Sequence, residues 1–113
     1  MKNLLKIAEE FSPAPIGRYR SDSNKSGEAF RDDLLFPRID KAIRENDVLV
    51  VDFEGMEGLT SSFLEEAFGG LISVKGLSAE AVIKALEFRP ENSYFDPYIE
   101  NVREYIRDAQ DQQ

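Results

Sequence analysis

The stretch VLVVDFEGMEGLTSSFLEEAFGGLI, residues 48–72, decides the fold. Its first part belongs to an almost wholly apolar run over residues 47–53, which is typical of a central strand buried on both faces. Its second part predicts a helix over residues 62–73, because apolar side chains recur at helical spacing, at Leu64, Phe68, Leu71 and Ile72. A buried strand that leads directly into a helix indicates an α/β protein.

The segments before this stretch add further elements. Residues 3–11 predict a first strand, and residues 16–19 are a candidate for a short second strand inside a loop rich in proline and serine. A helix is predicted over residues 27–46, with Ser26 as its N-cap. Pro37 lies inside that helix and is expected to kink or split it, because proline removes one main-chain hydrogen bond.

The segments after it continue the alternation. Ser78 is predicted to cap a short helical turn that runs to Ala85, and residues 85–90 are the candidate last strand. The final helix is expected to begin at Asp96 as N-cap, with proline at the first helical position. Residues 109–113 are expected to form a disordered tail.

This order of elements predicts a single α/β domain over residues 1–113. Its central sheet is expected to be mixed but mostly parallel, with about four strands and three to four helices packed on it. A hydrophobic share of 42% and a charged share of 32% are typical of a soluble globular protein.

The charge balance excludes some classes of partner. The net charge of −8 argues against binding nucleic acid or lying on an anionic membrane, since both need clustered lysine and arginine. No apolar run approaches the roughly 20 residues that span a bilayer, and the first residues do not form a signal peptide. We therefore expect a cytoplasmic protein with no nucleic-acid or membrane partner, and the sequence leaves its oligomeric state open.

The chain contains no cysteine and no histidine. This excludes disulfides, thiol nucleophiles, Cys/His zinc sites and catalysis by Ser-His-Asp or Cys-His groups within the chain. We expect no catalytic residues, no metal site and no cofactor.

Three hydroxyl residues, Thr60, Ser61 and Ser62, stand where the central strand gives way to the next helix. Sites in open α/β sheets form at this edge, and the free N–H groups of a helix start attract anions there. Ser62 and Glu65 match a capping box, in which the serine is the N-cap and the glutamate reaches back to it. That interpretation leaves Thr60 and Ser61 without a structural role.

Gly69 and Gly70 lie inside the same helix. Each glycine in a helix costs about 1 kcal/mol relative to alanine. We expect a close approach to the helix backbone at this point, most simply by internal packing.

The same residues resemble the core motif of STAS domains, the fold of anti-sigma factor antagonists. The matching positions are Asp52, Gly55, Met56, Ser61, Ser62 and Leu64. A closer resemblance is to a bacterial STAS-like domain family of unknown function, carried by SSFLEEAFGGL at residues 61–71, by SGEAFR at residues 26–31 and by the preceding GRYRSD. The resemblance covers roughly residues 4–107. Thr60 and Phe63 depart from the antagonist motif, which has Asp and Gly there.

This resemblance implies a non-catalytic regulatory module that binds a protein, such as a histidine-kinase-type ATPase. In the antagonists the serine aligned with Ser61 is phosphorylated, so Ser61 is the candidate phosphorylation site, with Thr60 and Ser62 as further candidates. The implied partner-binding residues are Glu57, Thr60, Ser61, Ser62, Glu65 and Glu66. The family motif also suggests an anion-binding role for Arg18, Arg20 and Arg31.

Two alternatives stay open. A receiver-like signalling domain would accept phosphate on Asp52, with Glu9 and Glu10 as the acidic pair, although the candidate last strand has no lysine. An enzyme, or an accessory subunit of one, would rely on carboxylates such as Asp52, Glu54 and Glu57.

Overall fold

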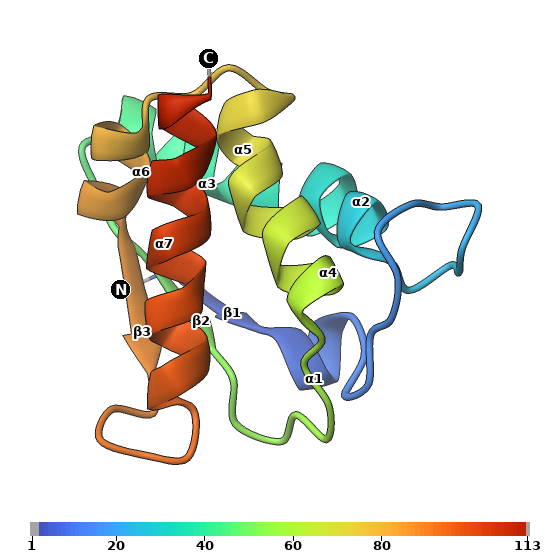
Figure 1. Ribbon diagram of the computed structural model, residues 1–113. Coiled ribbons are helices and arrows are strands. Elements are labelled where there is room, and N and C mark those ends of the chain that lie inside the picture. The colour runs from blue at the N-terminus through green and yellow to red at the C-terminus, as the bar shows by residue number, and fades with distance from the viewer. Residues whose placement is uncertain (1–2, 113) are drawn as a thin grey trace.

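A parallel three-stranded sheet lies at the centre of the computed structural model, which describes residues 3–112 (Figure 1). Its strands are β1 (Asn3–Lys6), β2 (Leu49–Asp52) and β3 (Leu86–Arg89), in the order β1-β2-β3. Every residue of β2 is buried, as its apolar sequence predicts. The predicted α/β class with a parallel sheet is confirmed, but the described sheet has three strands instead of about four and no antiparallel pair.

The amino-terminal predictions were partly wrong. β1 stops at Lys6 and α1 (Ile7–Glu10) follows at once, where a strand was expected as far as residue 11. Glu10 explains the change, because its carboxylate accepts a hydrogen bond from the Lys6 N–H at 2.9 Å and so stabilises a helical turn. Residues 16–19 form no strand; Ile16 instead donates a main-chain hydrogen bond to Lys25 across the loop.

The first long helix, called helix one here, runs over residues 27–44 as α2 (Gly27–Phe30), a π-helical segment η1 (Arg31–Leu35) and α3 (Phe36–Arg44). The Ser26 cap is confirmed, since its hydroxyl accepts from the Ala29 N–H at 3.2 Å. Pro37 does not split the helix. The π turn ends just before it, with the Phe36 N–H donating to the Arg31 carbonyl, so the spacing of the main-chain hydrogen bonds changes next to the proline and the helix continues.

The second long helix, called helix two here, runs over residues 61–73 as α4 (Ser61–Leu64), η2 (Glu65–Gly69) and α5 (Gly70–Ser73). Like helix one, it contains one π-helical segment. The predicted helix over residues 62–73 is confirmed to within one residue at its start.

The carboxyl-terminal elements are α6 (Ala79–Ala85) and α7 (Asp96–Asp111). Ser78 caps α6, as predicted, by accepting from the Ala81 N–H at 3.3 Å. Phe95, not Asp96, is the N-cap of α7. The predicted disordered tail is helical as far as residue 111, and Gln110 holds it in place by accepting from the Ala79 N–H at 3.0 Å; Gln113 lies outside the described residues.

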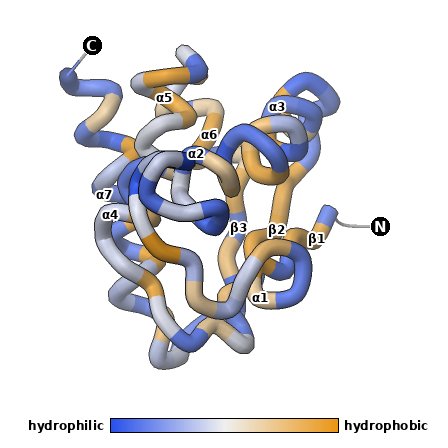
Figure 2. The backbone as a smooth tube through the Cα atoms, turned by 90° about the vertical axis from the view of Figure 1, so that its right-hand side faces the viewer, coloured by the Kyte–Doolittle hydropathy of each residue, from blue (hydrophilic) through white to orange (hydrophobic). Residues whose placement is uncertain are grey.

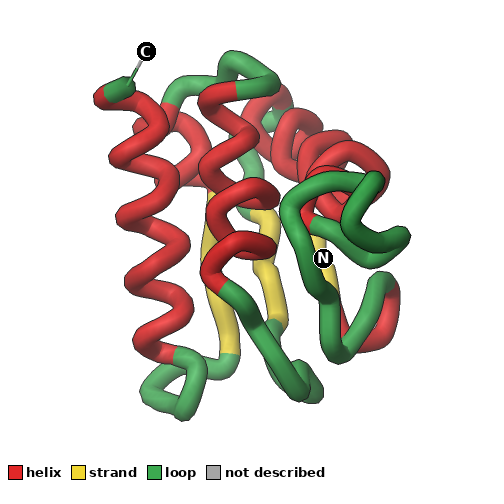
Figure 3. Tube along the Cα trace, turned by 45° about the vertical axis from the view of Figure 1, so that its right-hand side comes forward, coloured by secondary structure: helices red, strands yellow, loops and turns green. Residues whose placement is uncertain are grey.

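Helix two and α7 lie side by side across one face of the sheet (Figures 1 and 3). The aromatic rings of Phe53 and Phe68 contact Phe88 of β3 in the core, with centroids 5.8 and 6.1 Å apart. Figure 2 shows the apolar strands and the polar outer turns of the helices. The carboxyl ends of the strands meet the loops over residues 53–60 and 90–95 at one edge, called the carboxyl edge here (Figure 3).

Gly27 offers a direct test of how closely the two long helices pack. A Cβ atom added there would lie 2.7 Å from the Phe63 carbonyl oxygen and 2.9 Å from the Glu66 Cβ. We expect Gly27→Ala to lower the free energy of unfolding by about 1–3 kcal/mol, measured by urea denaturation. Gly58→Ala is the control, because, apart from its own chain neighbours, no described atom lies within 4 Å of that Cβ position. Equal midpoints for the two variants would contradict the close packing.

Candidate functional site

The loop that leaves β2 is tightly held. Asp52 is only 3% exposed, and its carboxylate accepts from the Glu54 N–H at 2.9 Å and faces Arg89 Nε at 3.6 Å. Gly55 turns the chain with a φ of +88°, a value that favours glycine. The Glu57 N–H then donates to the Pro13 carbonyl at 2.7 Å. These bonds direct the chain to the start of helix two.

Thr60, and not Ser62, caps helix two. The Thr60 hydroxyl accepts from the Phe63 N–H at 3.3 Å and lies 3.4 Å from the Ser62 hydroxyl. The predicted capping box was therefore wrong, because the third helical position belongs to Phe63 and not to Glu65. Phe63 is fully buried among aromatic side chains, and this burial sets where the helix begins.

Ser61 belongs to the same group of hydroxyl residues as Thr60 and Ser62 but does not cap helix two. It is the first residue of α4 and is exposed. Among the described residues its hydroxyl has no hydrogen-bond partner, whereas both neighbouring hydroxyls contact each other. A phosphate on this oxygen would lie at the positive end of helix two, which tolerates negative charge.

The predicted partner-binding glutamates lie in three different environments. Glu57 is exposed in the loop at the carboxyl edge. Glu65 is half exposed and pairs with Arg18 at 2.6 Å. Glu66 is only 14% exposed and pairs with Arg31 at 2.7 Å. Glu66 is therefore part of the interior and does not belong to an exposed surface with the others.

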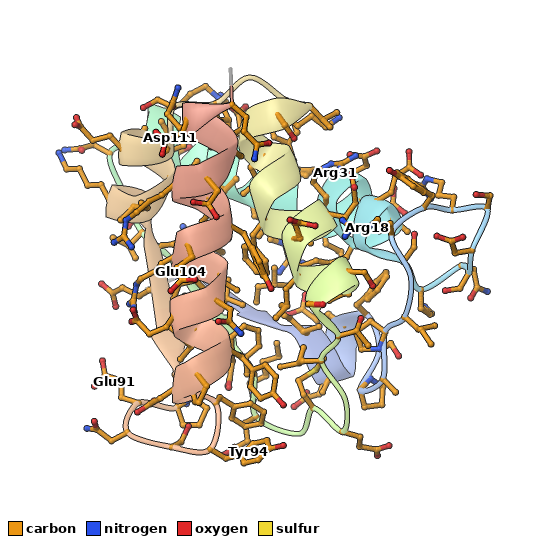
Figure 4. The ribbon with its side chains drawn as sticks, viewed as in Figure 1. Arg18, Arg31, Glu91, Tyr94, Glu104 and Asp111 are labelled. Atoms are coloured by element: carbon orange, nitrogen blue, oxygen red, sulfur yellow. The ribbon has the colours of Figure 1, made fainter. Side chains whose placement is uncertain are left out.

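Arg31 is the centre of this interior network (Figure 4). Its Nη1 donates to the Glu66 carboxylate at 2.7 Å and to the Glu66 carbonyl at 2.9 Å, and its Nε donates to Asp32 at 2.9 Å. Lys75, just after helix two, pairs with Asp32 at 3.2 Å. A Cβ atom on Gly70 would collide with Arg31 Nη1. The expected close approach is therefore internal packing: the Arg31 guanidinium lies against Gly70, and Tyr105 of α7 lies against Gly69.

The three arginines suggested as an anion site do not converge. Arg18 and Arg31 both reach helix two, but each is paired with a glutamate there. Arg20 instead pairs with Asp33 of helix one at 2.7 Å. The hydrogen bond to Glu65 raises the pKa of Arg18, as expected for a cation that already has its counter-charge.

The sequence analysis did not identify two tyrosines near this edge. Tyr94 is 75% exposed in the loop before α7 (Figure 4), and its ring lies 5.9 Å from that of Tyr98. Both tyrosines line a shallow hollow together with Glu57 and Leu59. Exposed tyrosine is enriched in protein interfaces. The position of Tyr94 in a turn-rich part of the sequence was the signal that could have identified it.

Three of the carboxylates named for the alternative functions are already bonded to other groups, those of Asp52, Glu9 and Glu10. Asp52 is also buried, whereas Glu54 and Glu57 are exposed. Glu9 pairs with Lys6 at 3.5 Å, and Glu10 pairs with Arg38 at 2.6 Å. Across residues 3–112, no group of three or more acidic side chains is placed to hold a metal ion.

The two glycines of helix two provide a matched pair of variants. At both positions, intrinsic helix propensity favours alanine over glycine by about 1 kcal/mol. Gly69→Ala would bring its Cβ only to 3.4 Å from the Tyr105 carbonyl, whereas Gly70→Ala would displace Arg31. We expect Gly70→Ala to be less stable than Gly69→Ala by about 2 kcal/mol in urea denaturation. Similar stabilities would mean that Arg31 does not need this space.

The Asp32 network predicts a pH dependence. Burial by itself raises the pKa of the Asp32 carboxyl, but hydrogen bonds from Arg31 and Lys75 outweigh it and hold that pKa below its usual value. The resulting stabilisation is complete above the unfolded-state pKa near ~4 and is lost as the pH falls through the lower folded-state value.

We therefore expect Asp32→Asn to lower the free energy of unfolding by about 1.5 kcal/mol at pH ~6 and to change it much less at pH ~2.5. Urea denaturation at both pH values measures this difference. Asp33→Asn is the control, because its partner Arg20 forms an exposed pair of small value. If Asp32→Asn lowered the free energy of unfolding equally at both pH values, the stabilisation would not come from the ionised Asp32 carboxylate.

None of the described helices combines the length and apolarity needed to cross a bilayer.

Comparison with known proteins identifies the family of this chain. No curated protein and no solved structure gives a significant match to the chain. A family model described as a STAS-like domain of unknown function matches residues 26–94, which include helix one, β2, helix two and β3. The chain therefore belongs to the STAS-like domain family.

Proposed function

We propose that this protein is a non-catalytic regulatory module that binds a partner protein through its carboxyl edge. The observation that carries the proposal is the exposed Ser61 hydroxyl at the start of helix two, which the fold itself does not use. Membership of the STAS-like family supports a regulatory role. By resemblance to anti-sigma factor antagonists, the partner is a histidine-kinase-type ATPase.

The docking edge, as we define it, consists of exposed or half-exposed residues around Ser61. It comprises Glu57, Thr60, Ser61, Ser62 and Glu65, with Tyr94 and Tyr98 nearby. Glu66 is left out because its carboxylate is bonded to Arg31 inside the molecule. A surface of this kind combines aromatic contact area with polar and charged side chains, both of which contribute to the recognition of a protein partner.

Phosphorylation of Ser61 is the proposed switch. It would add close to two negative charges beside Glu57 and Glu65. Because the phosphate would sit at the N-terminus of helix two, the fold would tolerate it while the charge of the docking edge changed. A cytoplasmic location is part of the proposal, since a chain without cysteine suits a reducing compartment.

Partner capture from the native host tests this function. Tagged wild type, Ser61→Asp and Ser21→Asp are compared by quantitative mass spectrometry. Ser21 lies exposed in the long loop, so its variant makes the same charge change away from the docking edge. We expect a histidine-kinase-type ATPase with wild type and Ser21→Asp, reduced about tenfold or more with Ser61→Asp. Capture of the same unrelated protein by all three forms would refute the switch and the partner class together.

A further inference from the structure

The outer side of β3 is an open sheet edge. β2 lies between β1 and β3, so within residues 3–112 no strand covers β3 on its other side (Figure 1). The Arg89 carbonyl accepts from the Phe53 N–H at 2.9 Å, which places the main chain of Arg89 toward β2. Main-chain groups alternate between the two sides of a strand, so those of Phe88 face the open edge. Such an edge is a template for another strand.

A groove of about 430 Å³ runs along this edge, between β3 and α7. Apolar side chains of Leu86, Phe88 and Ile99 line its inner part. Glu87 and Glu91 line its outer part. The groove shares no residue with the docking edge around Ser61.

The charge of the groove is negative. Arg103 and Glu100 both line it and compensate each other, since they pair at 2.8 Å, and Arg103 also lies over the Phe88 ring at 5.5 Å. Two further acidic residues of the lining, Glu91 and Asp96, are exposed and add negative charge. Arg89 of the same strand faces Asp52 instead. The groove therefore favours cationic side chains.

We propose that this groove binds an extended, basic segment of a partner protein, which adds to β3 as a further strand. Its main chain would bond to the outward groups of Phe88, and its lysine or arginine side chains would lie near Glu91 and Asp96. This is strand addition at a sheet edge, in which main-chain bonds supply affinity and side chains supply selectivity. A second copy of this chain is a poor occupant, because symmetric pairing of two β3 edges would bring the same acidic groove residues together.

The test is an NMR titration of the isotope-labelled full chain with a short acetylated peptide of alternating lysine and valine. We expect amide shifts centred on residues 86–89 and on the facing side of α7, with slowed amide exchange at Phe88. A peptide with the same side chains but N-methylated main-chain amides keeps the charge and cannot form the ladder, so it should not bind.

Charge reversal locates the site. Glu91→Lys should weaken binding of the lysine–valine peptide by about three- to tenfold. Glu104→Lys is the matched control, because Glu104 is exposed on α7 but does not line the groove (Figure 4). The proposal is overturned if the peptide does not bind at millimolar concentration, if the N-methylated peptide binds equally well, if both variants weaken binding equally, or if the shifts centre on Ser61. None of these outcomes depends on whether Ser61 controls the docking edge.

Discussion

The buried guanidinium of Arg31 is the interaction on which the packing of the two long helices depends. It leaves helix one and bonds to both the side chain and the main chain of Glu66 in helix two. A buried cation without such partners would cost several kcal/mol, so the fold requires Glu66 as an internal counter-charge. The same contact requires glycine at position 70, because any side chain there would occupy the space of the guanidinium.

The helix pairing determines where the candidate site lies. Gly27 lets helix one approach the Phe63 carbonyl, and Phe63 packs against Phe30 with ring centroids 5.6 Å apart. Burial of Phe63 in turn places Thr60 at the cap and Ser61 on the surface. Packing therefore gives neighbouring hydroxyl residues different environments. Thr60 caps helix two, whereas Ser61 is exposed.

Both long helices contain a π-helical segment, at η1 and at η2. Such segments are frequent at functional sites, but here each lies next to a structural feature of the two helices. The first lies just before Pro37, which cannot donate a main-chain hydrogen bond. The second contains Glu66, whose carbonyl accepts from Arg31. The two surfaces that we propose to bind partners lie instead at edges of the sheet, the carboxyl edge near Ser61 and the outer edge of β3.

The sequence by itself determined the elements whose signals are local. The apolar run of β2, the helical periodicity around Phe68 and the caps at Ser26 and Ser78 all depend on neighbours within a few residues. The family motif likewise identified the STAS-like class and drew attention to Ser61. Local patterns were less successful near Lys6, where a glutamate four residues later ends the strand.

Only the tertiary structure decided which charges are paired and which edges are open. Arg18, Arg20 and Arg31 looked like one basic group, but their partners Glu65, Asp33 and Glu66 come from positions that the helix packing brings near. The Gln110 contact that orders the last turn of α7 and the open side of β3 also depend on elements distant in sequence. Periodicity reports which side of an element is apolar, whereas ion pairs and sheet edges are properties of the assembled elements.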